Sequence, residues 1–150
     1  MSKKILMMVS AAGLLTLLMT TGSAMAGGYA YGAATDKKDR PATVEVIKGS
    51  TVKRVTVTEK ASKRLDIHTG EIANDGAHQL SVPYSSIVYD ISGGTWVYTM
   101  PQPLTYVRQS VEVQTIKGET AFLKSGPVPG TKIVTVGVAE IYGAEKGLGH

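Results

Sequence analysis

Residues 106–116 read YVRQSVEVQTI, and apolar and polar side chains alternate along this stretch. Successive residues of an extended chain point to opposite sides, so side chains two positions apart share a face. The apolar face holds Val107, Val111 and Val113, and the polar face holds Arg108, Ser110, Glu112 and Gln114. This alternation predicts a β-strand with one face on a core and the other in solvent.

The same signal recurs on both sides of this stretch. Short runs rich in β-branched and aromatic residues occur at 44–46, 52–57, 80–82, 87–89, 95–98, 121–123 and 133–136. Glycine-containing turns separate several of them, at residues 90–94, 116–119 and 126–130. Short strands with close turns predict an all-β fold, a small antiparallel β-barrel or sandwich. Its core is expected to consist of valine and isoleucine, with Trp96 as the largest packing element.

One or two short helices are expected beside the strands. Thr58 is a candidate N-cap for residues 59–65, because its hydroxyl can accept a hydrogen bond from the first turn. Residues 138–142 are expected to form a final helical turn that ends at Gly143. The β domain is then predicted to span residues 44–143, and residues 144–150 to form a flexible tail.

Residues 1–26 have the order of a secretory signal peptide: two lysines, an apolar segment at residues 5–19, and the small-x-small sequence AMA at 24–26. The apolar segment reaches about 22 Å as a helix, short of the roughly 30 Å hydrocarbon core of a bilayer. Cleavage after Ala26 is therefore expected, and an uncleaved anchor is the alternative. In either case we expect the chain to be exported, to the periplasm or the outer face of the cytoplasmic membrane. Residues 27–43 are predicted to be a flexible leader.

Composition excludes several classes of protein. The chain has 150 residues, of which 43% are hydrophobic and 19% charged, as expected of one globular domain. The formal net charge is +4, and Lys3 and Lys4 of the predicted signal peptide contribute two of the positive charges. Such a small excess favours no nucleic-acid partner. Because cysteine is absent, there is no disulfide, thiol nucleophile or cysteine-based metal site.

No motif predicts catalysis or a cofactor. Residues 126–132 (GPVPGTK) differ from a phosphate-binding loop, because the glycine spacing is one residue short and prolines replace backbone donors. No Gly-x-Ser-x-Gly nucleophile elbow and no distinctive carboxylate pair occurs. We therefore expect a protein that is not an enzyme and that needs no cofactor.

A metal site is the main alternative from the residues. If the segments that carry His68 and His78 pair as a hairpin through residues 74–76, their imidazoles approach each other. With Met100 as a soft ligand, such a site suits exported copper or silver binding. The competing interpretation is two half-exposed histidines of strands or turns, with His150 in the tail.

Several segments together resemble the late part of periplasmic adaptor subunits, the membrane fusion proteins of RND-type tripartite efflux systems. These segments are 82–90 (VPYSSIVYD), 94–98 (GTWVY), 106–108 (YVR), 111–113 (VEV), Gly118, Gly126, 129–137 (PGTKIVTVG) and 139–143 (AEIYG). The resemblance covers residues 82–143. More loosely, residues 58–69 (TEKASKRLDIHT) are similar to the point where such adaptors first enter their β-rich body.

The resemblance implies a β-rich, membrane-proximal domain that leans on the periplasmic part of an inner-membrane pump. Adaptors do no chemistry; they couple pump to outer-membrane channel by protein contacts, and some handle copper or silver. Between the two similar segments, adaptors place a lipoyl-like domain and a long helical hairpin, whereas only residues 70–81 stand here. Docking beside a pump is therefore expected, and bridging to the channel is not.

The expected function is thus an exported, non-catalytic efflux-adaptor-like domain, peripheral to the membrane, that supports export. Its expected partner is an inner-membrane efflux pump or a full-length adaptor subunit. From strand polarity, the residues predicted to contact it are Tyr84, Arg108, Glu112 and Gln114. Open edges of a small sheet also allow a homo-oligomer. The alternative is a small periplasmic metal- or ligand-binding module that uses His68 and His78.

Overall fold

The computed structural model describes residues 40–74, 76 and 79–148 of the chain. Over these residues the strands form two antiparallel sheets in a sandwich-like arrangement, accompanied by two short α-helices. The predicted all-β fold with short helices is confirmed. The predicted signal peptide and most of the predicted leader lie outside the described residues.

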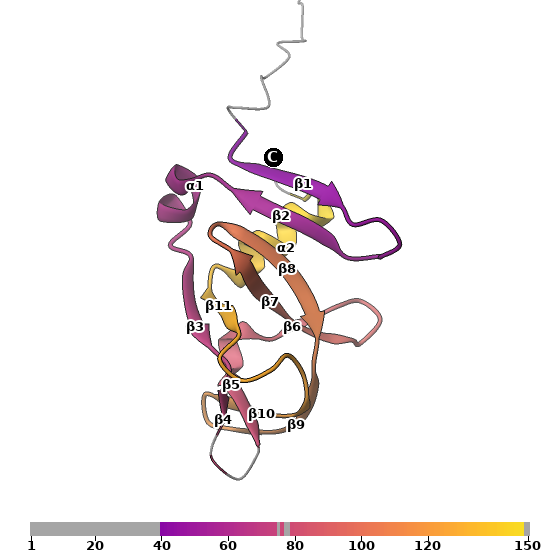
Figure 1. The fold of residues 1–150 in the computed structure, drawn as a ribbon, viewed down its shortest axis with the longest axis vertical. Coiled ribbons are helices and arrows are strands. Elements are labelled where there is room, and N and C mark those ends of the chain that lie inside the picture. The colour runs from indigo at the N-terminus through magenta and orange to yellow at the C-terminus, as the bar shows by residue number, and fades with distance from the viewer. Residues whose placement is uncertain (1–39, 75, 77–78, 149–150) are drawn as a thin grey trace, which may run out of the picture. The chain divides into compact units, whose positions relative to one another are not determined.

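Within the described part of the chain, seven strands build the larger sheet and four build the smaller one (Figure 1). The larger sheet has the order β1 (Ala42–Val46), β2 (Lys53–Val57), β8 (Thr105–Ser110), β7 (Thr95–Gln102), β11 (Lys132–Val136) and β3 (His68–Glu71), and β6 (Val88–Tyr89) also pairs with β7. The smaller sheet has the order β4 (Ala73–Asn74), β5 (Leu80–Pro83), β10 (Thr120–Ser125) and β9 (Glu112–Lys117). β1 thus begins inside the segment predicted to be a flexible leader.

At two places the chain passes between the two sheets through a single buried residue. Ile72 separates β3 from β4, and Val111 separates β8 from β9. Both belong to one apolar cluster, which also contains Val82, Val97, Ala121, Leu123 and Ile133. The prediction of one continuous strand over 106–116 is therefore wrong, because Val111 turns inward to this shared core and the chain continues in the other sheet.

A second apolar cluster lies beneath the C-terminal helix. It consists of Val55, Val57, Ala61, Val88, Tyr98, Tyr106, Val134, Val138 and Ile141. Its largest fully buried side chains are Tyr98 and Tyr106, whereas Trp96 is only partly buried at its border. Trp96 is thus not the largest packing element, because its indole nitrogen needs a polar partner and finds one at the surface.

The sequence predicts the start of α1 correctly and the end of α2 incorrectly. α1 (Glu59–Arg64) begins as predicted: the Thr58 hydroxyl accepts from the backbone N–H of Ala61 at 3.1 Å. α2 (Val138–Lys146) does not end at Gly143 but continues to Gly147, which adopts a left-handed conformation at φ 74°. The residues predicted to form a flexible tail therefore begin inside a helix.

Gly137 sets the direction in which α2 leaves β11. Its φ is +84°, and a Cβ atom at this position would lie 2.8 Å from Cγ1 of Ile67. Both the left-handed backbone and the close approach require glycine. The helix can therefore turn back over β2 and pack its apolar side on the second cluster (Figure 1).

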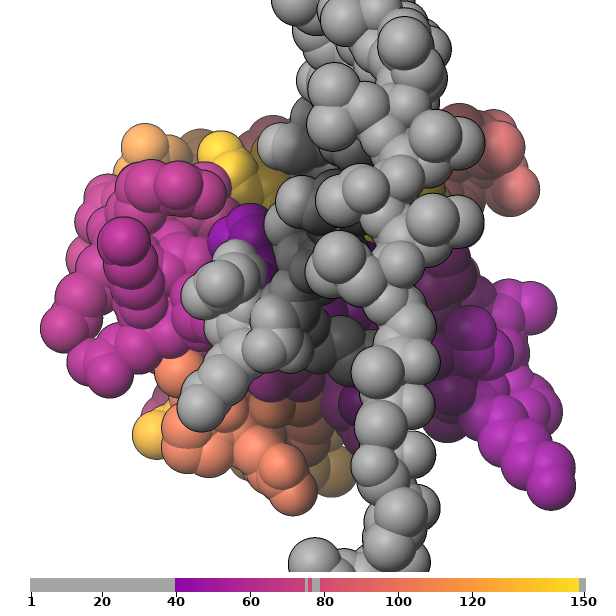
Figure 2. All heavy atoms as spheres, turned by 90° about the horizontal axis from the view of Figure 1, so that it is seen from above, coloured from indigo at the N-terminus to yellow at the C-terminus, as the bar shows by residue number. Residues whose placement is uncertain are grey.

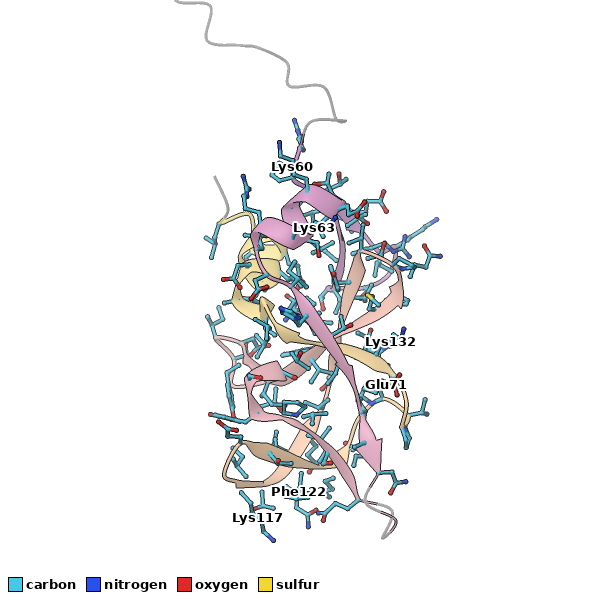
Figure 3. All side chains as sticks on the ribbon, turned by 90° about the vertical axis from the view of Figure 1, so that its left-hand side faces the viewer. Lys60, Lys63, Glu71, Lys117, Phe122 and Lys132 are labelled. Atoms are coloured by element: carbon cyan, nitrogen blue, oxygen red, sulfur yellow. The ribbon has the colours of Figure 1, made fainter. Side chains whose placement is uncertain are left out.

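Figures 2 and 3 show which elements lie at the two ends of the described part of the molecule. In Figure 2, α1 and the β1–β2 turn lie on opposite sides of the end that is seen from above. In Figure 3, Lys60 and Lys63 project from α1, and Lys117 lies with Phe122 at the far end. The Lys117 ammonium stands 5.6 Å from the centre of the Phe122 ring.

Candidate functional site

The four residues predicted to contact a partner do not share one surface. Tyr84 is 42% exposed on the 3-10 helix η2 (Tyr84–Ser86). Glu112 and Gln114 are exposed on β9. Arg108 is only 7% exposed on β8, so the prediction that it lies on a solvated face is wrong.

Arg108 is the centre of a buried polar cluster. Its Nε donates to Oε1 of Glu145 at 2.9 Å, and the hydroxyl of Tyr98 donates to the other carboxylate oxygen. Its guanidinium carbon lies 4.5 Å from the centre of the Trp96 ring. The Trp96 indole N–H in turn donates to Oδ2 of Asp90 at 2.8 Å. Side chains from residues 90–108 and from the distant α2 thus meet in one network.

The surroundings favour a neutral Tyr98 at one end of this network and an ionised Asp90 at the other. Burial, followed by the hydrogen bond to Glu145, raises the pKa of Tyr98 well above its usual value, so this hydroxyl stays protonated. The hydrogen bonds from the Trp96 side chain and the Gly94 backbone lower the pKa of Asp90, so its carboxylate stays ionised. Tyr98 thus acts as a hydrogen-bond donor and Asp90 as an acceptor in this network.

The cluster attaches α2 to the larger sheet. Glu145 is 2% exposed near the end of the helix, and its backbone carbonyl accepts from Nζ of Lys53 on β2 at 3.2 Å. Among the described residues, Nη1 of Arg108 is buried without a hydrogen-bond partner. Because the charged groups of Arg108 and Glu145 are almost fully covered, this ion pair holds a helix in place and does not present charge to a partner.

The strand that carries His68 and the hairpin that follows it lie in different sheets. His68 lies on β3, which pairs with β11 in the larger sheet, and its Nε2 lies 2.8 Å from Oδ1 of Asp66. The β4–β5 hairpin lies in the smaller sheet. The segment that carries His68 thus pairs with β11, and His78 itself lies outside the described residues, so the pairing of the two histidine segments through residues 74–76 stays a hypothesis. No group of three or more His, Asp or Glu side chains in the described part of the chain could hold a metal ion.

Two tyrosines form an exposed pair instead. Tyr84 and Tyr89 are 42% and 51% exposed. Interaction with the Tyr84 side chain, with a smaller contribution from burial, raises the pKa of Tyr89. Tyr106, by contrast, is buried in the core. The pair, here called the tyrosine pair, is a surface feature with the chemistry of a contact site.

Sequence reasoning missed Glu145 and Tyr89. Glu145 stands among glycines, which suggested a frayed tail. Its spacing from Val138 and Ile141, seven and four residues, would have placed it on the buried face of a longer helix. Tyr89 belongs to a run of aromatic residues in which only three-dimensional packing separates the core positions from the exposed ones.

Comparison with known proteins finds no family model, no curated protein and no solved structure that matches this chain. The assignment to efflux adaptors therefore stays a prediction from the residues. Across the described segments, the structure contains no helix that is both long and apolar enough to cross a membrane.

Proposed function

We propose that this chain is an exported, non-catalytic domain that acts by protein–protein contact with an RND-type efflux pump or its full-length adaptor. The observation that carries the proposal is the tyrosine pair, Tyr84 and Tyr89. The pair falls within residues 82–90, one of the segments that resemble adaptors.

The scaffold holds the tyrosine pair rigidly. The backbone N–H of Tyr84 donates to the carbonyl of Glu119 at 2.8 Å, and Oγ of Ser85 donates to the carbonyl of Thr135 at 2.9 Å. Tyr89 pairs with Thr95 across β6 and β7. Because the backbone is already ordered, binding through these rings costs little conformational entropy.

Tyrosine suits this task for a physical reason. Its ring supplies a large apolar contact area, its hydroxyl supplies a hydrogen bond, and few torsions are lost on binding. Tyrosine is accordingly enriched at the centres of protein interfaces. Two adjacent, half-exposed rings therefore favour a docking surface over a solvated strand face.

The other predicted contact residues are engaged within the chain. Glu112 accepts from Nζ of Lys124 at 2.8 Å, and Oε1 of Gln114 accepts from Nε2 of Gln79 at 2.9 Å. A partner would have to replace these bonds before it gained new ones. The tyrosine pair therefore carries the proposal, and β9 does not.

The test is site-specific photo-cross-linking in the chain's own host. A photoreactive residue replaces Tyr84 in one variant and Val128, an exposed loop residue, in a matched control. We expect position 84 alone to cross-link to an RND-type pump or adaptor identified by mass spectrometry.

A second arm removes the rings. Tyr84→Ala with Tyr89→Ala should lower recovery of that partner at least about tenfold, the loss typical of a buried interface aromatic. Val128→Ala should leave recovery unchanged. Equal recovery with both variants, or the absence of any pump or adaptor subunit, would contradict the proposal.

A further inference from the structure

An apolar groove of about 570 Å³ lies between α2, β1 and the end of α1. Its volume falls in the range of pockets that enclose small molecules, about 300–1,000 Å³. Its apolar lining includes Val44, Val57, Leu65, Ile141, Ala144 and Leu148. None of these residues belongs to the tyrosine pair, so the groove is a separate feature of the molecule.

The groove exists because α2 is too short to cover the whole core face of the larger sheet. Ala42 and Val44 of β1 stand opposite Val57 and Val55 of β2, both of which belong to the core. The nine residues of α2 cover the β2 side of this face. Val44 remains 38% exposed, so the apolar face continues past the helix to the mouth of the groove.

Charged residues of the lining leave an excess of positive charge. Arg40 and Arg64 contribute two guanidinium groups and Glu140 contributes one carboxylate. The salt bridges between described residues involve none of these three side chains. Two positive charges against one negative charge leave a net +1, which complements a single anionic group.

We propose that this groove binds a single-chain amphiphile with an anionic head group, such as a long-chain carboxylate. The hydrocarbon tail lies against the apolar lining, and the head group pairs with Arg40 and Arg64. A hydrocarbon tail brings no hydrogen-bonding groups into the groove. An extended peptide would bring an N–H and a C=O with each residue, and the apolar side chains could not satisfy them. The site is independent of the proposed protein contact.

The test uses hexadecanoate as the probe and the full chain purified from its own host, followed by titration calorimetry. We expect one-to-one, saturable binding. Hexadecanol, with the same tail and no charge, should bind about tenfold more weakly, which corresponds to one lost charge-assisted hydrogen bond. Shortening the acid should weaken binding about two- to fourfold for each methylene removed.

Three variants locate the binding. Val44→Asp should abolish hexadecanoate binding, because the new carboxylate repels the anionic head group and replaces an apolar contact with the tail. Arg64→Gln, an exposed change at the end of α1, should weaken hexadecanoate about tenfold and leave hexadecanol unchanged. Arg54→Gln is the control: Arg54 is also an exposed arginine, on β2, but it pairs with Glu45 and does not line the groove. Thermal unfolding verifies that each variant is folded.

Four results would overturn the proposal. One is the absence of saturable hexadecanoate binding, and another is equal binding of the acid and the alcohol. A third is a ligand-free dimer that Val44→Asp dissociates, because a second copy would then fill the groove. The fourth is binding that appears only after proteolytic removal of residues 27–39, because the chain's own leader would then be the occupant.

Discussion

Two ion pairs of this molecule have similar nitrogen–oxygen distances and opposite surroundings. Arg108 of β8 and Glu145 are joined at 2.9 Å with side chains 6% and 2% exposed. Lys124 of β10 and Glu112 of β9 are joined at 2.8 Å with side chains 68% and 55% exposed. The distances predict similar interactions, whereas the burial predicts very different consequences of breaking them.

The difference arises from desolvation. Water solvates either partner of the exposed pair when the other is removed, so the pair contributes little to stability. Around the buried pair no water replaces the lost partner, and an uncompensated charge remains in the core. The buried pair therefore determines whether α2 stays on the sheet, and the exposed pair does not.

The largest expected effect is that of Glu145→Ala. It leaves the Arg108 guanidinium and the Tyr98 hydroxyl without their shared acceptor. We expect the free energy of unfolding to fall by about 3–5 kcal/mol, the usual cost of an orphaned buried charge. Denaturant unfolding followed by circular dichroism measures it.

A triple variant sharpens this result. Arg108→Met, Tyr98→Phe and Glu145→Leu together replace the polar groups with apolar ones of similar size, and such exchanges are often neutral or stabilising. We expect the triple variant to be clearly more stable than Glu145→Ala alone. Equal instability of the two variants would show that packing, not the orphaned charge, is the cause.

A smaller effect is expected for Tyr98→Phe, which deletes one hydrogen bond to a carboxylate at a cost of about 1.5–3 kcal/mol. The raised pKa of Tyr98 also makes stability depend on alkaline pH. Below the ordinary pKa of 10.0 the contribution is complete. As the pH rises further, the unfolded chain ionises and the folded one does not, so stability is lost.

The measurement is denaturant unfolding at several pH values upward from about 8, where tyrosine is still protonated. Phenylalanine at position 98 should reduce the alkaline loss of stability. Part of it should remain, because burial also raises the pKa of Tyr106. An unchanged pH dependence in the variant would contradict this assignment.

The smallest effect is expected for Glu112→Gln in the exposed pair. The hydrogen bond from Lys124 lowers the pKa of Glu112 below its ordinary 4.5. Its contribution is therefore present above that pH and is lost as the pH falls through the folded-state pKa. The variant should weaken the acid dependence of stability slightly, and added salt should remove the difference. A loss of stability as large as that caused by Glu145→Ala would contradict the proposed difference between the buried and the exposed ion pair.

Local chemistry explains what could be predicted. The Thr58 cap and most strands could be predicted from the sequence because alternation, β-branching and capping act between residues close in sequence. The segment 106–116 shows the limit. Its alternation is genuine, but Val111 enters a core that also contains Ile72 and Ile133, and no local pattern encodes that meeting.

The candidate site was less accessible than the fold. Tyr84 was identified as exposed, but its partner Tyr89 was not, because exposure depends on which strand covers which ring. Arg108 was placed on a solvated face, since nothing near it in sequence indicates Glu145, 37 residues away. A long-range pair of this kind becomes visible only when α2 is folded over the sheet.

The sequence by itself determined the all-β fold, most of the strand segments and the capped start of α1. These features depend on side-chain alternation, β-branching and hydrogen bonds between near neighbours. Only the tertiary structure decided that Arg108 is buried, that the two tyrosines pair and that α2 leaves a groove beside β1. Each of these depends on free energies of burial and desolvation between segments far apart in the chain, which appear only when the sheets and helices are packed together.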